Sequence, residues 1–356
     1  MGTKIYKAIF LLIGIFSLGY MIYGIGLDEI WLNMQKTGVW FIPVIGSWLV
    51  IYILNAFAFN AIIQEPELPQ SNLPFWSVLR LTITGYAINY ITPFVALGGE
   101  PYRIMELKPK LGINKASSSV LLYSLMHMFS HVMFWLVSIG LILAFIPVNN
   151  LMLAGCGFML LVSVVLGYWF IRVYKKGFTV STVKLLTKMP FIGKKANAFA
   201  IEKQDSLKEI DNQITILYTD RKAKFYSSLV LEFIARVVGC AEIYFTAIAI
   251  GLDMSVMEAL IVSSASSLFA NLIFFFPMQL GTREGGLAMA LESVGLPAAG
   301  GIFIGVVMRI REIFWILIGL ALMNKKGVKT EENGFETEPQ SELDYAHAAA
   351  QNKKTW

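Results

Sequence analysis

Long apolar stretches alternate with short polar ones over most of the chain. Several of them reach the roughly 20 residues that a helix needs to cross the hydrocarbon core of a bilayer. The pattern therefore predicts an all-α polytopic integral membrane protein. The apolar windows cover residues 8–27, 39–63, 75–97, 116–146, 151–173, 225–252, 256–277 and 298–323.

Basic residues predict the orientation of these windows. The polar stretch 174–224 holds eleven Lys or Arg against five Asp or Glu, and loops rich in Lys and Arg face the cytoplasm. Lys4 and Lys7 near the start and Lys325 and Lys326 after the last window predict that both termini are cytoplasmic. The first window is long and no Ala-x-Ala site follows it, which favours a retained helix over a cleaved signal peptide.

Two segments must then begin and end on the same side of the membrane. Residues 64–115 would start and finish in the cytoplasm, and residues 253–297 would start and finish outside. Each is predicted to be a broken re-entrant hairpin, and their opposite orientation predicts two inverted repeats. The alternative is that each segment forms two ordinary full spans. The helix breakers at the middle are Pro93, Gly98 and Gly99 in the first segment and Pro277 and Gly281 in the second.

Polar segments complete the predicted organisation. We expect a transmembrane domain over residues 1–323, in which 174–224 is a cytoplasmic connector, followed by a disordered cytoplasmic tail over 324–356. Within the connector, apolar residues recur at helical spacing and predict an amphipathic helix that lies on the membrane or packs under the bundle. These residues are Leu207, Ile210, Ile214 and Leu217. Basic residues that we expect in a loop after the first hairpin are Arg103, Lys108, Lys110 and Lys115.

Composition agrees with a membrane protein and excludes several function classes. Hydrophobic residues make up 56% and charged residues 15%, against about 25% charged in soluble domains. The net charge of +5 lies mainly in loops, so it does not indicate a nucleic-acid partner. Cys156 and Cys240 lie in apolar windows and are expected to be core residues. The chain has no Walker A sequence and no nucleophile elbow, so we expect no enzyme activity and no cofactor.

The first candidate site is the run Gly98, Gly99, Glu100 and Arg103. Paired glycines allow close backbone approach, and the N–H groups at a helix start bind phosphate or carboxylate. Arg103 would add a bidentate cation, and Glu100 could orient it or bind an amine. The alternative is that Glu100 and Arg103 pair with each other and fix the turn.

The second candidate site repeats this chemistry in the other half of the chain. Gly281, Arg283 and Glu284 follow the break at Pro277 and would bind a substrate from the opposite side. The alternative is an extracellular loop with solvated charges, which the flanking apolar windows disfavour.

Three charges lie well inside the last apolar window: Arg309, Arg311 and Glu312. An unpaired charge at mid-membrane costs at least ~2.5–3.5 kcal/mol on insertion scales, so these side chains are expected to face inward and to pair. Arg309 and Glu312 share a helix face, so a structural pair within the helix is the alternative. Arg311 needs another partner, for which a lipid phosphate or Glu284 is a candidate.

Further polar residues lie in other apolar windows. Glu232 and Arg236 are four apart, which favours a structural pair with a supporting role, whereas Glu242 has no partner nearby in sequence. His127 and His131 are also four apart, but no acid or cysteine nearby completes a metal site. We therefore expect polar contacts between helices there and no metal.

The chain resembles the flippase-like family of the lysylphosphatidylglycerol synthase transmembrane region, the membrane module of the multiple peptide resistance factor. The resemblance covers about residues 5–325. It implies translocation of a phospholipid, aminoacylated in the best-known members, without the aminoacyltransferase domain of the bifunctional ones. It rests on Pro93, Gly98, Gly99, Glu100 and Arg103, on Pro277, Gly281, Arg283, Glu284, Gly285 and Gly286, and on Arg309.

The leading hypothesis is that this protein moves an anionic or aminoacylated lipid between the leaflets of a prokaryotic cytoplasmic membrane. Arg103, Arg283 and Arg309 would contact the headgroup, and Glu100 and Glu284 would balance them or bind an amine. One alternative is an ion-coupled carrier for a small soluble anion. Another is a non-transporting subunit of a lipid-modifying or glycosyltransferase enzyme. A homo-oligomer or such an enzyme partner is left open.

Overall fold

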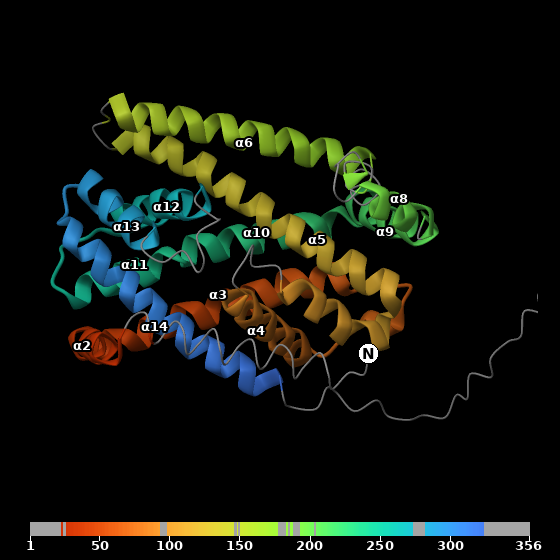
Figure 1. Ribbon diagram of the computed structural model, residues 1–356, viewed down its shortest axis with the longest axis horizontal. Helices are drawn as coiled ribbons and strands as arrows, with labels where there is room; N and C mark the ends of the chain where they lie inside the picture. Colours follow the sequence, from red (N-terminus) through yellow and green to blue (C-terminus); the bar gives the residue numbers. More distant parts are fainter. Residues whose placement is uncertain are drawn as a thin grey trace, which may run out of the picture. The chain divides into compact units, whose positions relative to one another are not determined.

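The computed structural model describes residues 23, 26–92, 98–145, 148, 150–176, 183, 186–187, 193–202, 204–272 and 282–323, and these form α-helices and short 3₁₀ turns without a β-strand (Figure 1). The helices are α2 (Leu27–Thr37), α3 (Phe41–Ile63), α4 (Phe75–Ile91), α5 (Gly99–Phe145), α6 (Asn150–Lys176), α8 (Gly193–Glu202), α9 (Gln204–Thr219), α10 (Lys222–Val238), α11 (Cys240–Ala249), α12 (Val256–Leu272), α13 (Thr282–Ser293) and α14 (Ala298–Met323). The all-α prediction is confirmed.

Among the described residues, three stretches are long and apolar enough to cross a membrane: Leu27–Ile63, Gly99–Phe145 and Met152–Phe170. A helix satisfies all its backbone hydrogen bonds internally, which is why apolar sequences adopt it in lipid. Proline precedes and glycine follows several of the helices. The helices α4 and α14 begin directly after Pro74 and Pro297, whereas α11 and α13 are followed by Gly251 and Gly295 at positive φ.

Two glycines change the helix boundaries that the sequence predicted. Residues 103–111 are helical rather than a loop, and α5 is interrupted at Gly112, whose φ of 74° is outside the helical range. The window 225–252 forms two helices, α10 and α11, joined at Gly239. A glycine is a common cause of such a kink because it lacks a side chain.

Small residues allow α14 to approach its neighbours closely. A Cβ atom on Gly319 would overlap the Cβ of Ala87 in α4, and one on Gly301 would overlap the backbone of Ala288 in α13. Close approach of this kind is the usual basis of helix association in membranes. Figure 1 shows α6 lying along α5, and α10 packs against α3 and α5.

Residues 204–219 of the predicted connector form α9, and the apolar face of this helix is buried. Ile210, Ile214 and Leu217 belong to one core cluster with residues of α5 and α10. The structure therefore supports packing under the bundle rather than lying on the membrane surface.

The first predicted break falls where a helix ends, because α4 ends at Ile91 and α5 begins at Gly99. At the second, α12 is described as far as Leu272 and α13 from Thr282. Residues 93–97 and 273–281, with Pro93, Pro277 and Gly281, lie outside the described residues, as do the first window up to residue 22 and the tail 324–356. Re-entrant hairpins and inverted repeats therefore stay predictions.

Candidate functional site

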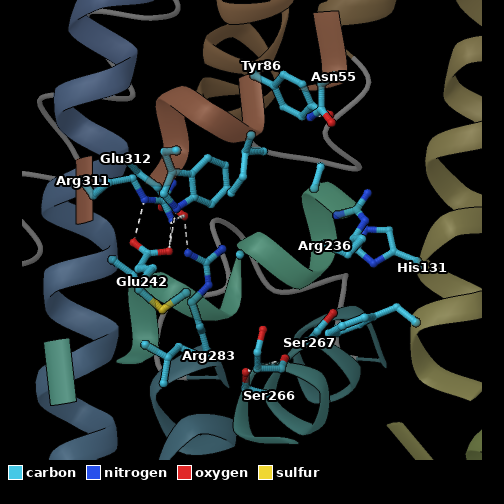
Figure 2. A pocket seen from close by; sticks show the side chains of 18 of the residues that line it. Asn55, Tyr86, His131, Arg236, Glu242, Ser266, Ser267, Arg283, Arg311 and Glu312 are labelled. Atoms are coloured by element: carbon cyan, nitrogen blue, oxygen red, sulfur yellow. Dashed lines mark hydrogen bonds and ion pairs between the residues drawn. The ribbon is translucent and has the colours of Figure 1, made fainter. Parts of the chain in front are cut away.

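A polar cavity of about 300 Å³ lies between helices from both halves of the chain. Figure 2 shows Arg283, Glu242, Arg311 and Glu312 gathered on one side of it and Arg236 and His131 on the other. Charged side chains inside a membrane protein are costly and mark functional pathways. The polar and aromatic lining consists of Trp48, Asn55, Tyr86, Tyr90, His127, His131, Phe134, Arg236, Glu242, Ser263, Ser266, Ser267, Arg283, Arg311 and Glu312.

The best-shielded ion pair of this wall joins α14 to α11. Arg311 donates from Nε to Glu242 Oε1 at 2.8 Å and from Nη2 to Oε2 at 3.0 Å. The indole N–H of Trp48 in α3 donates to the same carboxylate at 2.8 Å, and the Arg311 guanidinium lies 3.6 Å from the Trp48 ring centroid. Bidentate pairing and stacking both exploit the flat guanidinium, which a lysine could not replace.

A second pair continues this wall into α13. Arg283 donates to Glu312, whose carboxylate also lies 3.7 Å from Arg311 Nη2. Arg283, Glu312, Arg311 and Glu242 thus alternate in charge around one side of the cavity. A cavity wall of this kind offers both donors and acceptors to a ligand.

Arg309 and Glu284 form a third pair that does not line the cavity. Arg309 donates through Nε and Nη2 to the two carboxylate oxygens of Glu284, the second bond measuring 3.0 Å. Gly305 makes room for it, since a Cβ there would lie 2.7 Å from Glu284 Cγ. This pair ties α13 to α14 behind the cavity wall.

The opposite wall is formed by α10, α5 and α4. Arg236 Nη2 lies 2.7 Å from His127 Nε2, and His127 Nδ1 lies 2.8 Å from Glu232 Oε2, which is fully buried. Tyr86 OH is 3.1 Å from the same Nδ1 and accepts a hydrogen bond of 2.9 Å from Asn55. The prediction of interhelical polar contacts for His127 is confirmed.

Arg103 lies behind Tyr86 and outside the cavity lining. It is only 2% exposed, with its guanidinium 5.1 Å and 5.3 Å from the ring centroids of Tyr86 and Tyr123. Arg103 Nη1 lies 3.5 Å from Glu100 Oε1. Within the described part of the chain, Arg103 Nε and Nη2 have no hydrogen-bond partner. Gly85 gives it room, because a Cβ there would overlap Arg103 Nε.

The paired glycines serve close packing. A Cβ on Gly99 would overlap the carbonyl oxygen of Gly85, and one on Gly98 would overlap Thr92 Oγ1. The Gly99 N–H, which the sequence offered to an anion, donates to Asn89 Oδ1 at 2.7 Å. These glycines therefore bring α5 against α4.

Four of the predicted substrate-binding and supporting residues line one cavity, namely Arg236, Arg283, Arg311 and Glu312. Glu242, His127 and His131, which the sequence marked as polar residues in apolar windows, line it as well. The others are distributed around it: Glu232 behind His127, Glu284 with Arg309 behind the α14 wall, and Glu100 with Arg103 behind Tyr86. Sequence reasoning missed the aromatic lining. Tyr86 and Tyr90, four apart in an apolar window, were the available signal.

A second cavity, of about 480 Å³ and mainly apolar, lies beside α5, α6, α12 and α13. Ile142, Met159, Ile261 and Met289 are among its lining residues. Helices α5, α12 and α13 line both cavities, so the polar and the apolar space share walls.

Comparison with known proteins agrees with this architecture. A family model described as the lysylphosphatidylglycerol synthase TM region matches residues 7–320, and no catalytic domain is found beside it. No curated protein and no solved structure matches the chain significantly. With its apolar spanning helices and charged interior, the chain is an integral membrane protein that belongs to the family of the lysylphosphatidylglycerol synthase TM region.

Proposed function

We propose that the protein translocates a phospholipid, or another anionic or aminoacylated lipid, between the two leaflets. The observation that carries this proposal is the cavity whose walls present Arg236, Arg283 and Arg311 together with Glu242 and Glu312. Arginines bind phosphate oxygens bidentately, and carboxylates bind ammonium groups. A headgroup with both groups would therefore find partners of both signs in one place.

The apolar cavity favours a lipid over a soluble anion. A soluble anion needs only the polar space, whereas a lipid must also keep its acyl chains out of water. Ala265 and Ile261 line the apolar cavity, and Ser263, Ser266 and Ser267 of the same helix line the polar one. A lipid could thus place its headgroup and one acyl chain on two faces of α12.

We also infer that the two halves are inverted repeats with hairpins that end within the membrane. Helix α4, which is described at both ends, has 17 residues, fewer than the ~20 that a full crossing needs. Gly112 interrupts the helix that follows it. Hairpins with short arms bring substrate sites near the middle of the bilayer in transporters of this kind.

The proposal is tested by measuring leaflet transfer in proteoliposomes. Phosphatidylglycerol, phosphatidylethanolamine and lysylphosphatidylglycerol carrying a fluorophore are each incorporated, and a membrane-impermeant reductant bleaches only the outer leaflet. Headgroup-selective transfer is expected from the parent protein. The variant Arg283→Gln should lose at least about tenfold in rate, since a hydrogen bond to a charged group contributes ~1.5–3 kcal/mol.

A matched control is Arg80→Gln, because Arg80 of α4 pairs with Glu106 of α5 and does not line the cavity. It should transfer lipid like the parent. Equal transfer by Arg283→Gln and the parent would contradict the proposal. Uptake of inorganic phosphate without transfer of any lipid would instead support the soluble-anion carrier.

A further inference from the structure

The hydrogen-bond chain from Arg236 through His127 to Glu232 has only one consistent polarity. A guanidinium donates and cannot accept, so His127 Nε2, 2.7 Å from Arg236 Nη2, must be the unprotonated acceptor. Nδ1 then carries the hydrogen and donates it to Glu232 Oε2 at 2.8 Å. The imidazole is therefore neutral as long as Arg236 stays in place.

Arg236 is the movable member of this chain. Its side chain is 19% exposed and lines the cavity, whereas Glu232, whose Oε2 lies 4.0 Å from Arg236 Nη2, is fully buried. Its other hydrogen bonds are long, 3.3 Å to Ser130 Oγ and 3.4 Å to the His127 carbonyl. A phosphate in the cavity would offer Arg236 a stronger, charge-assisted partner.

We propose that His127 is a proton-binding site that fills when a phosphate group occupies the cavity. The phosphate draws Arg236 Nη2 away from Nε2, and Nε2 accepts a proton from the aqueous solution. The only bond formed is Nε2–H, and the imidazolium keeps its hydrogen bond to Glu232. One negative charge and one proton enter together, which avoids the cost of burying an uncompensated charge. This inference rests on the proposed function, because it assigns an ion coupling to the same cavity.

The surroundings of His127 leave room for this change. Glu232 Oε1 and His131 Nδ1 are buried without a hydrogen-bond partner among the described residues, so the cluster has unused capacity for a proton. Helix α3 contributes Asn55 and α12 contributes serines, none of which titrates in this range. The titratable or charged groups facing the imidazole are Tyr86 from α4, Glu232 and Arg236 from α10, Tyr123, His131 and Arg103 from α5, and Glu242, Arg283, Arg311 and Glu312 across the cavity.

The competing interpretation is a fixed structural triad in which Arg236 never leaves His127. Histidine NMR distinguishes the two, because the chain has only three histidines. The protein, labelled with ¹⁵N-histidine in detergent, is titrated with acid alone, with inorganic phosphate, and with dihexanoylphosphatidylglycerol. The variant His127→Gln identifies the signal of Nε2.

A phosphate-bearing probe should raise the proton affinity of His127 about tenfold or more, since a hydrogen bond to a charged donor is released. A response to dihexanoylphosphatidylglycerol alone identifies a lipid headgroup, and a response to inorganic phosphate as well identifies any phosphate. Arg236→Ala should give the protonated imidazole without a probe, whereas Arg236→Lys should retain the probe dependence. An imidazole that stays neutral with both probes and in Arg236→Ala would overturn the proposal.

Leaflet transfer of labelled phosphatidylglycerol, measured in parallel, separates this inference from the proposed function. Lipid transfer with a His127 that never takes up a proton would refute the proton site and leave translocation standing. Proton uptake with inorganic phosphate in a protein that moves no lipid would support the proton site and refute lipid translocation.

Discussion

Arg311 and Glu242 face each other edge to edge although 69 residues separate them in the chain. Each side chain is only 1% exposed, and two hydrogen bonds of 2.8 Å and 3.0 Å join them. Trp48 covers the pair by donating to the carboxylate and stacking on the guanidinium. This single contact links α3, α11 and α14 at the cavity wall.

Removing one charge of this pair should destabilise the protein strongly. Glu242→Gln removes the carboxylate that binds Arg311 at Nε and Nη2 and leaves only Glu312, 3.7 Å away and shared with Arg283. Breaking a buried pair by removing one partner costs ~3–5 kcal/mol. Thermal and denaturant unfolding in detergent measure the loss. Glu209→Gln, an exposed glutamate on α9, is the control and should stay within about 0.5 kcal/mol of the parent.

The double variant Glu242→Met with Arg311→Met should be more stable than either single variant, because an apolar pair leaves no uncompensated charge. If the double variant lost as much unfolding free energy as the two single variants together, the broken ion pair would not be the source of the destabilisation.

Gly85→Ala should disturb Arg103, because the added methyl would overlap its guanidinium. Overpacking of this kind costs about 1–3 kcal/mol. Gly46→Ala in α3, where a Cβ meets nothing within 4 Å, should instead leave stability unchanged or raise it by up to about 1 kcal/mol. The free energy of unfolding of both variants checks this, and equal values would contradict the close approach of α4 and α5.

The connector helix should contribute to stability as a packed element. Leu217→Ala removes a side chain that is 1% exposed and should cost ~2–5 kcal/mol. Ile201→Ala, at a position 71% exposed, should change little. Equal unfolding energies for the two variants would mean that α9 does not pack under the bundle.

Filling the apolar cavity should slow lipid transfer selectively. Ala265→Phe adds a ring to this cavity, and we expect slower transfer of long-chain than of dihexanoyl phosphatidylglycerol. Leu161→Phe on the exposed face of α6 is the control. Equal slowing of both lipids by Ala265→Phe would exclude an acyl chain from this cavity.

The positions of the helices could be predicted from sequence because apolar runs in lipid have few alternatives to a helix. The kink at Gly112 and the division of the window 225–252 into α10 and α11 at Gly239 could not, since glycine is also tolerated within membrane helices. The amphipathic periodicity of α9 was sufficient to locate a helix, but only the tertiary structure decided which surface covers it.

Ion-pair partners were the least predictable feature. Spacing favoured a pair between Glu232 and Arg236, yet Arg236 Nη2 lies 4.0 Å from Glu232 Oε2. His127 Nδ1 is closer to the same oxygen, at 2.8 Å. Arg309 and Glu312 share a helix face, but Arg309 binds Glu284 and Glu312 binds Arg283. Sequence spacing reports only neighbours on one helix, whereas these partners come from other helices.

The order in which the chain is synthesised bears on how the α14 arginines enter the membrane. Glu242 and Glu284 precede Arg311 and Arg309 in the chain, so the carboxylates are already made when the arginines leave the ribosome. A helix that carries two arginines enters a bilayer alone at a cost of about 2.5–3.5 kcal/mol for each. Here Glu242 and Glu284 are available to neutralise the two arginines when α14 enters the bilayer. The ion pairs thus lower the cost of inserting the last helix.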